Sequence, residues 1–417
     1  MSRFASRSAR SLVSLAIAAG LAIAPAGAAT MRAFVTSTAC SGDLGACSAA
    51  GGDTGVVAAN NVCQEAAAAV GLDAGGALFR AWLSDATTDA YCNVLGLAGK
   101  RSDLPACGVG SLPAAGPWMR VDGLPYVESL PGLTSDGGTI TTIPVDESGA
   151  YVANTFFATG SDGNGTVNPT LYCNNWTDGT LSFSTNGGNT DSLGSGWGTG
   201  ATIACLPGLR LLCFETGAGD PLAYPSVPGA LVFVTSTRGS GDLASWDGSG
   251  GVGGLAGGDA ICQALAAAAF LPLPDSFVAL LSDGATDAAT RLTLDGPWKR
   301  VDGVLLADSL ADLTDGALDD AIAYDELGAR FFTDAWTGTT EAGLSTANHC
   351  LGWTSGVAGD TGTRGRPWRS ENDWTGVTPV GCQTSLHLFC FSNQLLLGWD
   401  NFELGIFRRW SQVVGQP

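Results

Sequence analysis

The sequence predicts an α+β protein built from two tandem copies of one domain, and three observations lead to this prediction. Short motifs recur in the same order in both halves of the 417-residue chain. Each half holds an Ala-rich stretch typical of a helix, followed by short apolar runs broken by Gly, Asp and Asn, which are typical of strands and turns. The 12 cysteines are distributed over both halves with repeated spacings. We therefore expect two disulfide-stapled α+β domains.

Residues 1–28 have the pattern of a secretory signal peptide. Three arginines precede a short apolar run, and Ala26-Gly27-Ala28 offers a small-residue cleavage site. This run is too short to cross a bilayer comfortably, and no other stretch reaches about 20 apolar residues. The sequence thus predicts a protein that is secreted or held at the cell surface, with no transmembrane segment once the signal is removed.

Motifs that keep their spacing define the two copies. The paired motifs are Phe34-Val35-Thr36-Ser37-Thr38 with Phe233-Val234-Thr235-Ser236-Thr237, Ser41-Gly42-Asp43-Leu44 with Ser240-Gly241-Asp242-Leu243, Gly116-Pro117-Trp118 with Gly296-Pro297-Trp298, and Arg120-Val121-Asp122-Gly123 with Arg300-Val301-Asp302-Gly303. Copy 1 therefore spans 31–216 and copy 2 spans 230–392. A Pro- and Gly-rich linker at 217–229 joins them, and a tail at 393–417 fits neither copy.

Within each copy, the expected elements follow one order. The Ala-rich segments 62–70 and 259–269 predict helices, with Asp259 as an N-cap candidate. Asp122-Gly123 and Asp302-Gly303 predict hairpin turns after short strands. Residues 211–214 and 388–391 predict terminal strands. The tryptophans that recur in both copies are expected in the core, and they are Trp118, Trp176, Trp197, Trp298, Trp353 and Trp374.

The composition limits the classes of partner and chemistry. With 19 Lys+Arg against 39 Asp+Glu the formal net charge is −20, so the surface repels phosphate backbones and a nucleic-acid partner is not expected. The sequence has no G-x-S-x-G, H-E-x-x-H, Walker or G-x-G-x-x-G pattern, and no Ser/His/Asp set recurs in both copies. We therefore expect a protein that is not an enzyme.

The cysteines divide into shared and copy-specific sets. Cys40 and Cys47 are both missing from copy 2, and Cys92 and Cys107 both lie in an insertion of copy 1, so each pair is expected to form a disulfide. The shared cysteines are Cys63, Cys173, Cys205 and Cys213 in copy 1, and Cys262, Cys350, Cys382 and Cys390 in copy 2. Four cysteines allow three pairings, which spacing does not rank. Metal binding by thiols is the alternative, but the chain has no C-x-x-C pair.

A family resemblance adds to these expectations. The Phe-Val-Thr-Ser-Thr strand, the Ile-Cys-Gln helix, the Trp-x-Arg-Val-Asp-Gly hairpin, the Cys-x-x-Trp-Thr segment and the final Cys-x7-Cys-Phe resemble the bacterial endostatin-like domain of unknown function. That family is similar to the leptospiral endostatin-like surface proteins and has a C-type-lectin-like fold, and the resemblance covers both copies. It implies nested disulfides, namely Cys63–Cys213, Cys173–Cys205, Cys262–Cys390 and Cys350–Cys382.

The resemblance also implies adhesion or ligand binding rather than catalysis. The first hypothesis is a secreted, non-catalytic binding protein that recognises glycans or extracellular and surface proteins, for example matrix proteins, with copy 2 as the better candidate. The alternatives are a structural envelope or matrix component without a saturable ligand, and a secreted hydrolase on the same fold. The Glu-Pro-Asn and Trp-Asn-Asp motifs of calcium-dependent lectins are missing from the chain.

The segment before Cys382 is the candidate ligand site. It concentrates cationic, aromatic and acidic residues in copy 2, which are Arg364, Arg366, Trp368, Arg369, Glu371, Asn372 and Asp373. Three guanidiniums around a tryptophan could bind a carboxylate, a sulfate or a sugar face through bidentate bonds and stacking. The alternative is that these arginines form ion pairs with nearby acids of a very acidic protein.

A second acidic segment is a weaker candidate for calcium. Its carboxylates are Asp315, Asp319, Asp320 and Asp325. Carboxylate oxygens are the ligands that calcium prefers, but the spacing is not that of an EF-hand. A solvated loop face is the alternative interpretation. No other cofactor is expected.

Overall fold

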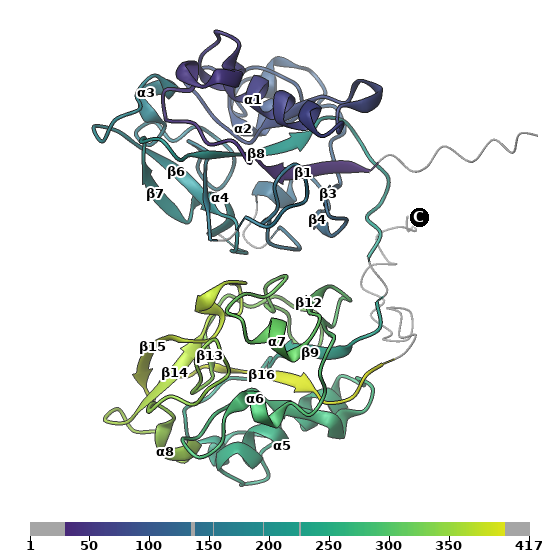
Figure 1. Ribbon diagram of the computed structural model, residues 1–417, viewed down its shortest axis with the longest axis vertical. Helices are drawn as coiled ribbons and strands as arrows, with labels where there is room; N and C mark the ends of the chain where they lie inside the picture. The colour runs from purple at the N-terminus through teal and green to yellow at the C-terminus, as the bar shows by residue number, and fades with distance from the viewer. Residues whose placement is uncertain (1–29, 135–137, 153, 195, 225–226, 397–417) are drawn as a thin grey trace, which may run out of the picture.

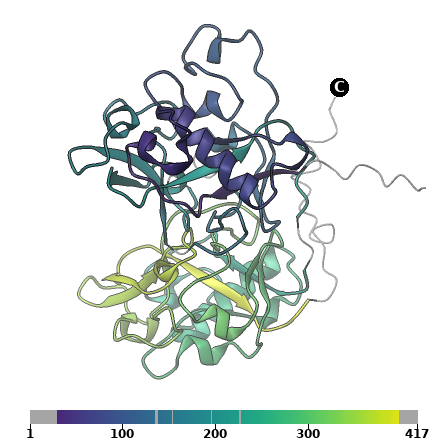
Figure 2. The same ribbon diagram turned by 45° about the horizontal axis from the view of Figure 1, so that its top comes forward.

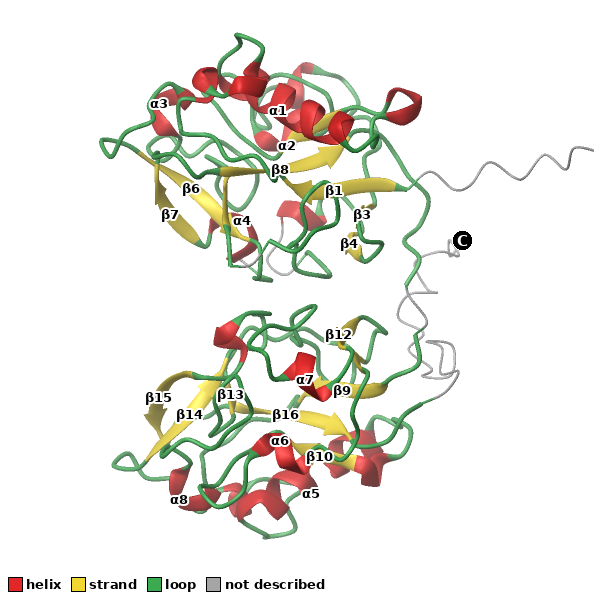
Figure 3. Ribbon diagram, in the orientation of Figure 1, coloured by secondary structure: helices red, strands yellow, loops and turns green. Residues whose placement is uncertain are grey.

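The computed structural model describes residues 30–134, 138–152, 154–194, 196–224 and 227–396. Within them the chain is α+β, with two eight-stranded sheets and short helices. Figure 3 shows that each sheet carries helices and long loops around it. The predicted signal peptide and the tail beyond residue 396 lie outside the described residues. In the described part of the chain, no helix has both the length and the apolar character needed to cross a membrane.

The two sheets have the same strand order. The first is β4-β3-β1-β8-β5-β6-β7 and the second is β12-β11-β9-β16-β13-β14-β15. β2 pairs with β8, and β10 pairs with β16. The strands of the first sheet are β1 (Met31–Val35), β2 (Phe79–Ala81), β3 (Trp118–Arg120), β4 (Pro125–Val127), β5 (Phe156–Ala158), β6 (Ser184–Asn189), β7 (Ala201–Ala204) and β8 (Arg210–Glu215). The strands of the second are β9 (Ala230–Val234), β10 (Phe277–Ala279), β11 (Trp298–Arg300), β12 (Leu305–Ala307), β13 (Ala335–Trp336), β14 (Thr361–Gly365), β15 (Val377–Gly381) and β16 (His387–Ser392).

The sheets contain the expected strands and hairpins. The terminal strands β8 and β16 are central, and five of the six residues of β8 and all six of β16 are buried, because these strands pair with neighbours on both sides. In the first hairpin, Gly123 N donates to the carbonyl of Arg120 at 3.0 Å, and Gly123 adopts φ +93°. The Asp-Gly pair supplies this left-handed residue at little steric cost.

The two long helices begin earlier than expected. The helices are α1 (Gly55–Ala69), α2 (Ala90–Asn93), α3 (Cys173–Trp176), α4 (Gly196–Thr199), α5 (Gly254–Ala268), α6 (Ala288–Arg291), α7 (Leu310–Leu313) and α8 (Cys350–Trp353). The prediction that Asp259 caps a helix is wrong, because Gly253 is the N-cap of α5. Asp259 lies inside the helix, accepts a hydrogen bond from Ala279 N at 2.9 Å and forms an ion pair with Arg291. Glycine has a low helix propensity, so the glycines at the start of α5 kept its first turns from being predicted as helix.

Six disulfides form, four within copy 1 and two within copy 2, and their pairings are those expected. They are Cys40–Cys47, Cys63–Cys213, Cys92–Cys107, Cys173–Cys205, Cys262–Cys390 and Cys350–Cys382. One disulfide of each copy explains the shared Ser-Gly-Asp-Leu motif. A Cβ on Gly42 would lie 2.5 Å from Cys173 Sγ, and a Cβ on Gly241 would lie 2.3 Å from Cys350 Sγ. Only glycine fits against the sulfur at these positions.

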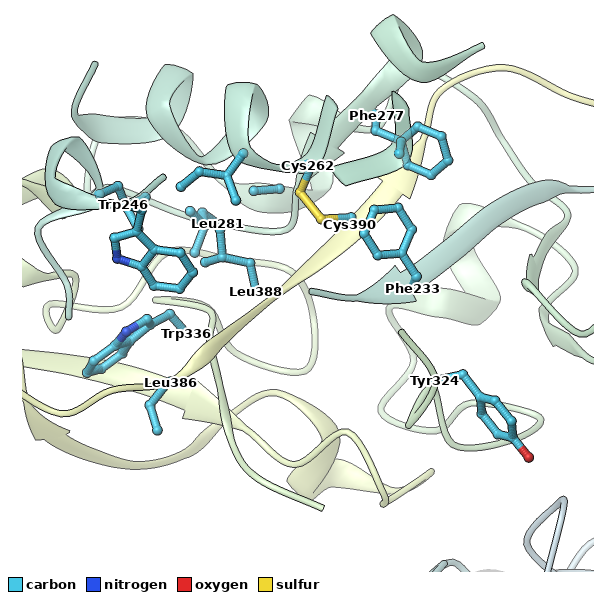
Figure 4. Packing of buried hydrophobic residues seen from close by; sticks show 14 of the residues in the cluster. Phe233, Trp246, Cys262, Phe277, Leu281, Tyr324, Trp336, Leu386, Leu388 and Cys390 are labelled. Atoms are coloured by element: carbon cyan, nitrogen blue, oxygen red, sulfur yellow. A yellow bond between two sulfur atoms is a disulfide. The ribbon is translucent and has the colours of Figure 1, made fainter. Parts of the chain in front are cut away.

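Each copy has two apolar core clusters, and one of them packs the long helix against the sheet. Figure 4 shows the Cys262–Cys390 disulfide of copy 2 between Phe233, Phe277 and Leu281. All six tryptophans that recur in both copies are buried, as expected, with at most 5% of the side chain exposed. The duplicated tryptophans therefore serve packing and are not available to a ligand.

The copies face each other through their loops. Figure 1 shows α1 and α5 on opposite outer sides of the molecule, while the hairpins β3–β4 and β11–β12 lie on the inner sides. The turned view in Figure 2 shows loops of both copies meeting between the two sheets. The linker runs along one side, where Lys299 Nζ donates to the carbonyl of Val227 at 2.7 Å.

Candidate functional site

The predicted ligand segment lies where the two copies meet. We call this contact surface the inter-copy joint. It is formed by Arg120, Thr139–Thr142, Tyr151, Asn154 and Asp191–Gly194 of copy 1, and by Arg300, Asp320, Tyr324, Arg330, Phe332 and Trp368–Glu371 of copy 2.

Two of the three arginines are paired within copy 2. Arg364, on β14, forms an ion pair with Asp334 and donates to the carbonyl of Thr378. Burial raises the pKa of Asp334, and the Arg364 guanidinium opposes this effect. Arg366 forms an ion pair with Asp373, with both side chains more than a third exposed. An exposed pair of this kind contributes little stability, so Arg366 keeps an accessible guanidinium.

The third arginine binds copy 1. Arg369 Nη2 lies 2.8 Å from Asp191 Oδ2, whose side chain is fully buried. The carbonyl of Asp191 accepts a hydrogen bond from Ser370 N at 3.0 Å. Burial raises the pKa of the Asp191 carboxyl to about 6, although Arg369 opposes the increase. Arg369 is thus a contact between the copies in this structure.

The acidic residue of the segment also reaches copy 1. Glu371, 7% exposed, accepts hydrogen bonds from the hydroxyl of Tyr151 and from the backbone N–H of Asn154. Burial raises the pKa of Tyr151, and the hydrogen bond to Glu371 raises it further. Asn372 and Asp373 lie in the short 3-10 helix η8 (Asn372–Trp374). The charged residues of the segment therefore have intramolecular partners, while its role toward a ligand stays a prediction.

Backbone pairing closes this side of the inter-copy joint. Leu193 N donates to the carbonyl of Trp368 at 2.9 Å, and Ser192 and Arg369 form an antiparallel bridge. Leu193 is 1% exposed and packs into the core cluster of copy 2, where Trp368 also lies. An apolar side chain of copy 1 thus contributes to the core of copy 2.

Asp320 holds the centre of the inter-copy joint. Its Oδ2 lies 3.3 Å from Arg120 Nη1 of copy 1, and its Oδ1 lies 3.3 Å from Arg300 Nη1 of copy 2. The two arginines occupy equivalent positions of the shared Arg-Val-Asp-Gly motif, and one carboxylate serves both. Burial raises the pKa of Asp320 to about 6 despite both guanidiniums. Copy 1 has Thr141 at the position equivalent to Asp320, so the arrangement is not symmetrical.

Neighbouring side chains of copy 2 bind backbone carbonyls of copy 1. Arg300 Nη2 donates to Ile140 O at 3.0 Å, and the hydroxyl of Tyr324 donates to the same oxygen at 3.4 Å. Arg330 Nη1 donates to Thr139 O. Thr142 N in turn donates to Asp320 Oδ1 at 3.2 Å. These contacts make the inter-copy joint polar and specific in register.

The acidic segment predicted for calcium does not form a cluster. Among the described residues no group of three or more His, Cys, Asp or Glu side chains is arranged to hold a metal ion. The oxygens of Asp320 contact arginines and backbone N–H groups. Asp325 caps its own loop by accepting from Leu327 N and Ala329 N. Asp315 is exposed and accepts from Ala317 N. For Asp319, burial and the nearby Asp312 raise the pKa to about 6.

A feature that the sequence prediction missed lies on copy 1. Leu181, Phe183 and Leu206 are 74%, 40% and 40% exposed at the open end of the β6–β7 hairpin. Phe183 lies opposite Cys205, because its carbonyl accepts a hydrogen bond from Cys205 N at 3.2 Å. We call these three residues, which lie at the same end of the hairpin, the copy 1 apolar cluster. At equal spacing from the third shared cysteine, copy 2 has Ala358, Asp360 and Gln383, and this difference between the copies is the signal in the sequence.

Comparisons with known proteins give no indication of function for this chain. No protein-family model and no curated protein matched the chain.

Proposed function

We propose that this chain is an exported, non-catalytic binding protein that recognises extracellular or surface proteins. In this proposal each copy has a C-type-lectin-like, endostatin-like fold, and copy 1 carries the recognition surface. The observation that carries the proposal is the copy 1 apolar cluster, because several exposed apolar side chains at one end of a hairpin on a stapled scaffold are typical of protein interaction sites.

Export is supported by the covalent structure. Six disulfides join all 12 cysteines, and disulfides persist in oxidising compartments. The N-terminal signal pattern agrees with this assignment. Nested disulfides and a central terminal strand in each copy support the endostatin-like interpretation.

The inter-copy contacts favour copy 1 over copy 2 as the binding copy. Arg369 and Glu371, which we expect to bind ligand, already contact Asp191 and Tyr151 of copy 1. The three side chains of the copy 1 apolar cluster are at least 40% exposed in the described part of the chain and are therefore accessible. An apolar surface also fits a polypeptide better than a glycan, since glycans offer mainly hydroxyl groups.

A binding screen of the full oxidised chain tests the proposal. The immobilised chain is exposed to a panel of matrix proteins, surface proteins and glycans, with and without calcium. We expect saturable binding of at least one protein, weakened at least tenfold by Leu181→Asp and unaffected by calcium. The matched control is Val357→Asp, which changes an exposed apolar residue of copy 2, at 60% against 74% for Leu181. Glycan binding that depends on calcium, or equal loss with both variants, would contradict the proposal.

The second candidate is a structural component of the envelope or matrix, which the inter-copy joint favours. Two stapled copies joined through buried ion pairs form a stiff unit suited to a spacer. This candidate predicts retention with cell-surface material and no saturable protein partner in the screen.

A further inference from the structure

We propose that the outer edge of β7 binds an extended strand of another exported protein, which adds to the sheet of copy 1. The inference rests on the proposed function and names how the partner is recognised. The strand β7 ends the order of the first sheet, and among the described residues its pairing partner is β6 alone.

The hydrogen-bond pattern shows which groups of β7 point outward. In an antiparallel pair, successive residues turn their N–H and C=O groups alternately toward and away from the partner strand. Cys205 N donates to Phe183 O, so Cys205 and Ile203 face β6. Thr202 and Ala204 therefore face outward. Asn186, which lies opposite Thr202 on β6, supports this orientation, because its N–H points away from β7 and donates to Leu171 O at 3.0 Å.

The equivalent edge of copy 2 is protected at the same position. Three residues before the third shared cysteine, copy 2 has Pro379 where copy 1 has Thr202. Cys382 N donates to Asp360 O at 2.9 Å and Gly362 lies opposite Val380. The β14–β15 pair then shifts register between Gly362 and Arg364, and Pro379 lies at this shift. Proline has no N–H to offer a foreign strand, and it is a common means of blocking an edge. Asp360 adds a charge at the open end of the same hairpin.

Copy 1 lacks both protections. β7 reads Ala-Thr-Ile-Ala and contains neither a proline nor a charge. Phe183 takes the place of Asp360, and Leu181 and Leu206 extend the apolar surface beside the edge. A strand-addition site combines free backbone groups, which give affinity, with side-chain contacts, which give specificity. The edge of β7 offers two outward N–H and two outward C=O groups for the first, and the exposed apolar side chains beside it offer the second.

Charge favours a foreign strand over a second copy of this chain. The net charge of −20 makes self-association unfavourable, and Asp178 follows Thr177, which forms a bridge with Asp43 ahead of the hairpin. The expected partner segment is therefore extended, free of proline, neutral or basic, and carries apolar side chains at alternate positions.

A displayed library of random twelve-residue peptides, selected on the full oxidised chain and counter-selected on the Thr202→Pro variant, tests the proposal. We expect enriched peptides with alternating apolar residues and positive charge. Their affinity should fall at least tenfold with Thr202→Pro, and methylation of alternate peptide nitrogens should have the same effect. Thr202→Val, which keeps the outward N–H, should change affinity less than twofold. Thr202 is exposed and its N–H points away from β6, so the variant should fold, and circular dichroism checks this.

Phe183→Asp provides a second variant that leaves the backbone edge intact. It copies Asp360 of copy 2 and should weaken the same peptides at least tenfold. Failure to enrich any peptide that distinguishes the chain from Thr202→Pro would overturn the proposal. Self-association of the chain that Thr202→Pro abolishes would overturn the choice of a foreign strand. If a protein partner from the binding screen still binds Thr202→Pro, the strand-addition inference fails while the proposed function stands.

Discussion

Removing the carboxylate of Asp320 tests how much the ion pairs at the inter-copy joint contribute to stability. The side chains of Asp320 and Arg300 are fully buried, and that of Arg120 is 4% exposed. In Asp320→Ala both guanidiniums stay buried and lose the carboxylate that they share. Each keeps an ion pair with the aspartate two residues later, Asp122 or Asp302. We therefore expect a loss at the lower end of the range for breaking a buried ion pair, about 3 kcal/mol.

Urea unfolding followed by tryptophan fluorescence, with the disulfides intact, measures this loss. Asp315→Ala is the matched control, because Asp315 is exposed in the same segment and should change the free energy of unfolding by less than about 0.5 kcal/mol. A second variant, Asp320→Asn, keeps an acceptor for Thr142 N and Ala321 N but removes the charge. A loss below about 1 kcal/mol for Asp320→Ala would refute the role assigned to this carboxylate.

Three further predictions concern pH, strain and packing. Burial raises the pKa of Asp191 and Asp320 to about 6, so the folded chain binds more protons than the unfolded chain between about 3.8 and 6. The extra stability from binding these protons is complete below about pH 3.8 and is lost as the pH rises through about 6. The melting temperature should increase from pH 8 to pH 5, less so in Asp191→Asn, and a decrease would contradict the assignment. Phe270, 88% exposed, follows the C-cap of α5 and adopts φ +57°, at the position where copy 1 has Gly71. Phe270→Gly should be more stable than Phe270→Ala by about 1 kcal/mol in thermal unfolding, because glycine relieves the left-handed strain, and equal stability would argue against strain. Gly241→Ala should lower the yield of oxidised protein sharply, since the added methyl would overlap the Cys350 sulfur, whereas exposed Gly250→Ala tests only the cost of a positive φ.

The sequence predicted the features that repeat. The motif order, the hairpins, the terminal strands and the buried tryptophans occur twice, so each copy supports the interpretation of the other. The disulfides between Cys40 and Cys47, and between Cys92 and Cys107, followed from cysteines that are present or absent in pairs. Helix starts were less predictable, because α1 and α5 begin at glycines with positive φ.

The inter-copy joint could not be predicted from the same repeats. Its contacts join positions that are not equivalent, such as Asp191 with Arg369, and these residues are far apart in the sequence. Asp320 has Thr141 as its counterpart, so the alignment shows a difference but not its partner. The copy 1 apolar cluster was missed for a related reason. Leu181, Phe183 and Leu206 come from two sides of a hairpin and lie at the same end of it only when β6 pairs with β7.

Amide hydrogen exchange tests the central claim, that the copies are joined through the loops expected to bind ligand. The backbone N–H groups of Leu193 and Ser370 donate to carbonyls of the opposite copy, Trp368 and Asp191. Exchange resolved by residue, in the full oxidised chain at low protein concentration, therefore reports the inter-copy joint directly. We expect both amides to exchange at least a hundredfold more slowly than in an unstructured chain, and Asp320→Ala to accelerate both. Exchange at the unstructured rate, beside protected amides in β8 and β16, would contradict the account.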